Sequence, residues 1–147
     1  MNWTPHVTVA AIVEKDGRFL LVEEMVEGRR CLNQPAGHWE QGETLLEAVV
    51  RETLEETGYT FRPQALLGVY HWDVPGKDLS YLRFAFIGEV GERDRQRPLD
   101  AGIIGPVWMA LGEMVTVGER LRSPQVLRGV RDYLAGQRHP LEVIGQV

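Results

Sequence analysis

The chain has 147 residues, 44% of them hydrophobic and 25% charged, which fits one globular domain over residues 1–147 and excludes a disordered or fibrous protein. A formal net charge of −5 argues against broad attraction to DNA, RNA or an anionic membrane. The single cysteine, Cys31, permits no intrachain disulfide, so we expect a reducing compartment and interpret Cys31 as a small buried strand residue.

The N-terminal segment, residues 1–13, shows neither a basic leader nor a small-residue cleavage pattern, so we interpret it as leading into the first strand and not as a signal peptide. No apolar run approaches the roughly 20 residues that a membrane-spanning helix needs. These features predict a cytoplasmic protein without a membrane or nucleic-acid polymer as partner, and we expect a monomer rather than a dimer.

The first third of the chain predicts strands. Residues 6–14 are β-branched and apolar on both faces, as in a central strand, and residues 15–18 carry an Asp-Gly hairpin signal. Residues 19–25 then return as the partner strand, and residues 31–38 form a short strand that runs into a glycine-bearing loop.

The loop and helix at residues 37–59 are the centre of the sequence. Thr44 precedes an apolar-periodic run and Glu47 follows three residues later, which predicts a capping box at the start of a helix, and Gly58 predicts its end. One broad arc of this helix is predicted to face the core: Leu46, Val49, Val50, Thr53 and Leu54.

The other side of the predicted helix carries three neighbouring acids, Glu52, Glu55 and Glu56. Positions three and four residues apart are adjacent on a helix surface, so these like charges repel each other. Solvent exposure offsets such repulsion, and so does a hard divalent cation that takes carboxylate oxygens as ligands. The residues alone leave both readings open.

The second half of the chain predicts a hairpin and a final helix. Residues 65–72 and 79–90 alternate as strands around a turn at residues 74–78, and residues 91–97 are interpreted as a charged, solvated loop. Residues 107–109 predict a short strand and residues 111–115 one helical turn. Ser123 and Pro124 predict the start of the last helix, which ends at Gly136 and buries a stripe made of Val126, Val130, Tyr133 and Leu134.

Two helices of good length and at least five strands predict an α/β (α+β) fold with a mixed β-sheet covered on both faces. The spacing of Gly37, Glu43, the Arg51-Glu52 pair, the Glu55-Glu56 pair and Gly58 resembles the signature of the Nudix hydrolases. The signature departs from the family at two looser positions, Thr53 and Tyr59, where an aliphatic residue is usual. The resemblance implies the α/β/α sandwich of that family.

The resemblance also implies roles for the signature residues. Glu52, Glu55 and Glu56 match carboxylates that bind Mg²⁺ or Mn²⁺, assisted by the backbone carbonyl of Gly37, and one of the three is an alternative base for the attacking water. Glu43 and Arg51 match an ion pair that fixes the loop to the helix. The implied reaction is attack of water on a phosphorus atom of a diphosphate.

Further residues near the signature are candidates for substrate binding. Arg83 lies inside a predicted strand, where it needs an anion or a carboxylate as partner, and both readings stay open. Asn33 and Gln34 either bind the loop backbone or read a substrate edge. Aromatic side chains that could stack on a flat ring, or instead belong to the core, are Trp39, Tyr70, His71 and Trp72.

Similarity to bacterial members of the family continues beyond the signature, from residues 6–10 to the tail at residues 136–145. It implies hydrolysis of hydroxymethylpyrimidine diphosphate, thiamine diphosphate and nucleoside di- and triphosphates with loss of the terminal phosphate. The alternatives are a pyrophosphohydrolase of nucleoside triphosphates or nucleotide sugars and, ranked below it, a binding module without catalysis. Many members carry a further acid before the late tryptophan strand, and here only Asp100 lies in that neighbourhood, two residues early. We favour Glu52 as the base.

Overall fold

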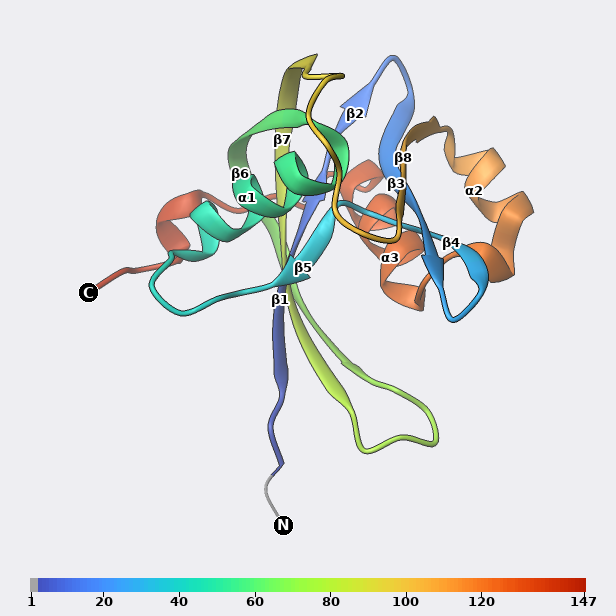
Figure 1. Cartoon of the computed structure of the whole chain (residues 1–147). Coiled ribbons are helices and arrows are strands. Elements are labelled where there is room, and N and C mark those ends of the chain that lie inside the picture. Colours follow the sequence, from blue (N-terminus) through green and yellow to red (C-terminus); the bar gives the residue numbers. More distant parts are fainter. Residues whose placement is uncertain (1–2) are drawn as a thin grey trace.

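The computed structural model describes residues 3–147, and within that range the chain forms two β-sheets flanked by helices (Figure 1). The first sheet has the order β5-β1-β7-β6, made of Ala36–His38, His6–Ile12, Ser80–Arg93 and Tyr59–Asp73. Strands β1 and β7 run parallel, while β5 and β6 pair with them antiparallel, so this sheet is mixed as predicted.

The second sheet is antiparallel and centres on β3. Strand β3 (Arg18–Val26) pairs with β2 (Glu14–Lys15), β4 (Arg29–Asn33) and β8 (Ile103–Met109). One residue, Val13, separates β1 from β2, so a nearly continuous strand passes from the first sheet to the second.

Two hydrophobic cores cover opposite faces of the strands. On β3, the side chain of Leu20 packs in the core under α1 (Leu45–Thr57), whereas Phe19 and Leu21 pack in the core under α2 (Leu111–Val117) and α3 (Pro124–Leu134). Figure 1 shows α1 on one side of the strands and α2 and α3 on the other. Successive strand residues point to opposite faces, so neighbouring side chains of β3 enter different cores. Because helices cover both faces, the predicted α/β/α sandwich is confirmed.

Helix α1 has the ends that the sequence predicts. The hydroxyl of Thr44 accepts a hydrogen bond from the backbone N–H of Glu47 at 3.0 Å, and the carboxylate of Glu47 accepts from the N–H of Thr44 at 2.8 Å. Gly58 ends the helix with φ = 79°, a conformation that glycine adopts without strain. Val49 is fully buried as expected, but Glu52 is also buried, against the prediction that placed it on the polar side.

Several strand boundaries differ from the prediction. Strand β6 begins at Tyr59, directly after the helix, and β7 continues to Arg93, so residues 59–64 and 91–93 are paired strands and not connections. The pair of Tyr59 with Arg93 extends the ladder, although residues 91–93 carry a glycine and two charges that are typical of a loop. Strand β8 begins four residues earlier than predicted, because its first residues pair with β3.

The last helix matches its prediction except at its C-terminal end. The hydroxyl of Ser123 accepts from the N–H of Gln125, and Val126 and Val130 are fully buried. Tyr133 is only half-buried and Leu134 is 51% exposed, so the buried stripe is shorter than predicted. Cys31 is half-buried rather than buried.

The tail after α3 returns across the first sheet. The N–H groups of Leu66 and His139 each donate to the carbonyl oxygen of the other at 2.8 Å, and Leu141 and Ile144 pack into the core beside α1. Across residues 3–147, no helix has the length and apolar character needed to cross a bilayer. Residues 1 and 2 lie outside the described residues. They begin the segment that we interpret from the sequence as leading into the first strand and not as a signal peptide. The cytoplasmic location and the monomeric state stay predictions.

Candidate active site

A cavity of about 600 Å³ opens between the β3–β4 hairpin, the loop at β5 and the β6–β7 hairpin. The two hairpins extend toward the same end of the molecule (Figure 1). Seven of the predicted site residues line this cavity: Asn33, Gln34, Gly37, Glu52, Glu56, Trp72 and Arg83.

One wall of the cavity is acidic and comes from α1 and β5. Glu52 is 9% exposed, and the carboxylate of Glu56 accepts a hydrogen bond from the backbone N–H of Ala36 at 2.9 Å. A Cβ atom at Gly37 would collide with the carboxyl group of Glu52. Only glycine therefore allows this carboxyl group to lie directly against the backbone of the loop.

Burial makes both carboxylates of the acidic wall costly to ionise. It raises the pKa of Glu52, an effect that the hydrogen bond from Arg51 opposes. Burial raises the pKa of Glu56 to about 9, and the N–H of Ala36 offsets only part of that increase. The negative charge of Glu52, followed by those of Glu24 and Asp100, raises the pKa of Glu56 further.

Arg51 joins the loop to the helix. Its Nε and Nη2 atoms donate to the two carboxylate oxygens of Glu43 at 3.0 and 2.8 Å, which is the ion pair expected from the signature. Nη1 donates to Oε1 of Glu52 at 2.8 Å and to Glu55 at 3.2 Å, and Nη2 also donates to the carbonyl of His38. These bonds raise the pKa of Arg51 well above its usual range and lower the pKa of Glu43.

Glu55 is the one member of the helix triplet that does not line the cavity, since its carboxylate turns toward Arg51. Within residues 3–147 no three side chains of His, Cys, Asp or Glu form a ready-made metal cluster. The oxygen donors on the acidic wall still suit a hard divalent cation such as Mg²⁺, whose charge would offset the buried carboxylate of Glu52 and the half-buried one of Glu56. Glu52, Glu56 and the carbonyl of Gly37 are the groups that would hold it.

A second wall of the cavity is basic. Arg83 of β7 is 6% exposed and donates to Oε1 of Gln34 at 2.9 Å and to Oδ1 of Asn33 at 3.2 Å. No carboxylate of the described residues forms an ion pair with Arg83, so the structural ion pair considered from the sequence is absent there. Lys77 and Arg122 line the same cavity.

The aromatic candidates separate into two groups. Trp72 lines the cavity and stacks on Tyr81, with ring centroids 5.8 Å apart and planes 18° from parallel. His71 is exposed, bonds Asp73 and does not line the cavity, because neighbouring strand residues face opposite sides. Trp39 also lies outside the lining: it is 48% exposed and its indole N–H donates to the carbonyl of Glu43. Tyr70 bonds Asp132 of α3.

The lining residues that were not singled out as site residues from the sequence include Glu24, Lys77, Tyr81 and Arg122. A signal existed for Tyr81, which lies two residues before Arg83 on the same strand and so shares its face. No local pattern points to the ion pair of Glu24 with Arg122, whose partners are 98 positions apart. Asp100, the acid noted in the sequence, donates its N–H to the carbonyl of Glu55.

The raised pKa of Glu56 predicts a pH-dependent stability of the metal-free protein. The folded state keeps a proton that the unfolded chain releases above about pH 4.5. The contribution of Glu56 to the free energy of unfolding is therefore fully present below pH 4.5 and is lost as the pH rises toward about 9. We expect Glu56→Gln to remove this loss. In a chelator, the thermal midpoint of the variant should then exceed that of wild type by an amount that grows from pH 5 to pH 8. A difference in midpoint that stays constant over this pH range would contradict the burial of an uncompensated carboxyl group.

Comparison with known proteins identifies the class. Residues 4–129 match the family model of the NUDIX domain, which covers most of the chain. The chain therefore belongs to the Nudix family and is a Nudix hydrolase.

The similarity extends to particular members of the family. Phosphatase NudJ of Escherichia coli strain K12 is 44% identical over 141 residues, which cover 96% of this chain and 91% of that protein. The solved structure of a NUDIX hydrolase from Nitrosomonas europaea has a TM-score of 0.95 and 44% identity, and the match covers 98% of both chains. A UDP-X diphosphatase, at 22% identity and a TM-score of 0.73 over 95% of this chain and 68% of that one, shares the fold.

Proposed function

We propose that the chain is a divalent-metal-dependent phosphohydrolase that removes the terminal phosphate from small diphosphates and triphosphates. One observation carries the proposal: a buried and a half-buried carboxylate of α1, Glu52 and Glu56, line the same cavity as a buried arginine of β7. An acidic wall that would hold a cation and a basic wall that would hold an anion fit a phosphate chain between them.

The residues of the chain divide the reaction between them. When bound to Glu52, Glu56 and the carbonyl of Gly37, Mg²⁺ would neutralise phosphate oxygens and lower the pKa of a water molecule. Glu52 accepts the proton of the attacking water at Oε2, because Arg51 already donates to its Oε1 at 2.8 Å. Arg83 offers its guanidinium to the negative charge that develops on the phosphoryl oxygens.

The rest of the substrate lies against the aromatic pair. Trp72 and Tyr81 line the cavity and present a flat apolar surface, which suits a heterocyclic ring. The 44% identity to Phosphatase NudJ supports phosphatase chemistry. As substrates we propose hydroxymethylpyrimidine diphosphate, thiamine diphosphate and nucleoside di- and triphosphates.

The identity of the product anion tests this function. Purified protein is incubated with Mg²⁺ and with ADP, ATP, thiamine diphosphate or a nucleotide sugar, and phosphate and pyrophosphate are measured separately. We expect orthophosphate from the first three compounds. Pyrophosphate from ATP, or a nucleoside monophosphate from the nucleotide sugar, would favour a pyrophosphohydrolase instead, and an absence of hydrolysis would favour a binding module.

Replacement of Trp72 tests the ring position. We expect Trp72→Ala to raise KM for an aromatic substrate about tenfold, since stacking of a base on an aromatic side chain is worth about 1–3 kcal/mol. His71→Ala is the matched control, because His71 is the adjacent residue on the opposite face, and its KM should stay within about twofold of wild type. Equal effects of the two variants on KM would remove Trp72 from the ring site.

A further inference from the structure

The basic wall contains a cation that forms no ion pair with any carboxylate among residues 3–147. Arg83 is 6% exposed, its two hydrogen-bond acceptors, Gln34 and Asn33, are neutral amides, and its buried Nε has no hydrogen-bond partner within the same residues. A buried charge held only by neutral groups is destabilising, because the desolvation of the ion is not repaid by a counter-charge. Such an arrangement is expected where a ligand supplies that charge.

A second guanidinium lies beside the first. Arg122 lines the same cavity, and its positive charge reaches Arg83. Burial lowers the pKa of Arg83 to about 10, the charge of Glu56 opposes this shift, and Arg122 adds a smaller lowering of the pKa. One nitrogen of Arg122 binds Glu24 at 2.7 Å, while the side chain stays 42% exposed. The remaining N–H groups are therefore accessible from the cavity.

The start of α3 supports this pair of arginines. Ser123 and Gln125 line the cavity, and the amide of Gln34 connects Arg83 to the first turn by donating to the carbonyl of Val126 at 2.8 Å. The N-terminal end of a helix carries partial positive charge, which adds to the charge of the two side chains. Three elements thus bring positive charge to one end of the cavity.

We propose that Arg83 and Arg122, at the start of α3, form an anion subsite that binds a phosphate group in the absence of metal. The subsite rests on the proposed function for its assignment to the terminal phosphate of the substrate and, after hydrolysis, to the orthophosphate product. It separates two tasks: the acidic wall binds the cation, and the basic wall holds the phosphate by its own charge. The held product competes with the next substrate molecule.

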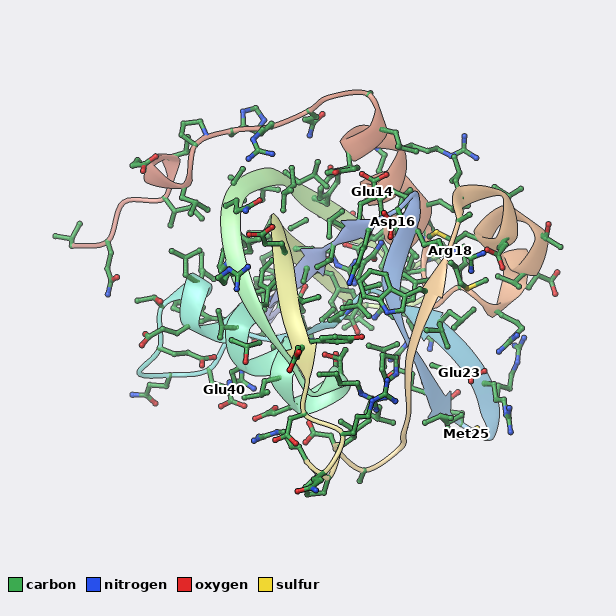
Figure 2. All side chains as sticks on the ribbon, turned by 90° about the horizontal axis from the view of Figure 1, so that it is seen from above. Glu14, Asp16, Arg18, Glu23, Met25 and Glu40 are labelled. Carbon is green, nitrogen blue, oxygen red and sulfur yellow. The ribbon has the colours of Figure 1, made fainter. Side chains whose placement is uncertain are left out.

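The chain contains a matched control for Arg122. Arg120 binds Glu23 at 2.6 Å, as Arg122 binds Glu24 at 2.7 Å, and the two arginine side chains are 44% and 42% exposed. Glu23 and Glu24 face opposite sides of β3, and only Glu24 and Arg122 line the cavity. Figure 2 shows Glu23 together with Met25 at the outer side of β3. Removal of either arginine changes the net charge equally.

The test is a calorimetric titration of the full chain with inorganic phosphate, in the presence of a chelator and at constant ionic strength. We expect binding to wild type, a weakening of about tenfold in Arg83→Met, and a clear weakening in Arg122→Gln, because hydrogen bonds to charged groups are the strong ones. Arg120→Gln should bind as wild type does. The thermal midpoint of Arg83→Met without phosphate should equal or exceed that of wild type, whereas a merely structural arginine would lower it.

The inference is overturned if wild type binds no inorganic phosphate without metal, or if Arg120→Gln weakens binding as much as Arg122→Gln does. If Arg83→Met fails to fold, the exposed pair of variants at positions 120 and 122 still decides the question. Hydrolysis of ADP with Mg²⁺ by the same preparation keeps the two proposals apart. Hydrolysis without phosphate binding removes the subsite alone, and phosphate binding without hydrolysis removes the proposed function alone.

Discussion

Glu56→Gln is expected to lower kcat by about 10²- to 10³-fold at saturating Mg²⁺, since a metal ion contributes several kcal/mol of charge stabilisation in the transition state. The substitution removes a charge from the acidic wall and keeps an oxygen that can accept the N–H of Ala36. Folding should therefore be retained, and without metal the thermal midpoint should rise. Steady-state kinetics and thermal unfolding of the same preparation measure both effects.

Glu47→Gln is the control for this experiment, because Glu47 lies on the same helix and glutamine also completes a capping box. Its kcat should equal that of wild type. Comparison with Glu52→Gln tests Glu52 as the base: we expect the affinity for Mg²⁺ to fall in both variants, because both carboxylates would hold the cation, and turnover at saturating Mg²⁺ to fall further in Glu52→Gln than in Glu56→Gln. Full activity of Glu52→Gln would end the assignment of Glu52.

Arg51→Met is expected to destabilise the protein by about 3 kcal/mol, as is usual when one partner of a largely buried ion-pair network is removed. Arg51 donates to Glu43, Glu52 and Glu55, and these carboxylates would be left close together without a counter-charge. The side chain is only 24% exposed, so water replaces its charge poorly. Chemical denaturation in a chelator measures the loss.

The control for Arg51 is Arg62→Met. Arg62 binds Glu89 at 3.0 Å on the surface, where both side chains are more than half exposed, and such pairs contribute at most about 1 kcal/mol. Saturating Mg²⁺ should restore part of the stability of Arg51→Met, since the cation would supply positive charge to Glu52, one of the three carboxylates that lose Arg51, and should leave the deficit of Arg62→Met unchanged. Equal losses in the two variants would show that Arg51 is an ordinary surface residue.

The elements that the sequence predicts well are those with local signals. The capping box at Thr44 and Glu47 and the glycine at 58 define α1 without help from the rest of the chain. Strand ends are different, because they depend on the partner. Residues 91–93 contain two charges and a glycine, yet they pair with the start of β6, and no feature of their own sequence announces that pairing.

The candidate site divides in the same way. Its acidic wall comes from one helix and the loop before it, so the resemblance of this one segment to the Nudix signature was enough to propose Gly37, Glu52 and Glu56 as site residues. The basic wall depends on contacts between distant residues: Arg83 binds Gln34 across 49 positions, and Glu24 binds Arg122 across 98. The burial of Glu52 also escaped the helical periodicity, since a neighbouring loop buries it and not the helix itself.

The contact of Glu52 with Gly37 limits how this active site can change in evolution or be transplanted by design. A carboxyl group fills the space that any larger residue at position 37 would need, so the loop and the helix must be inherited or grafted together. A scaffold that received the acidic helix alone would place the carboxyl group of residue 52 in open solvent, with an ordinary acidity and no raised affinity for a proton.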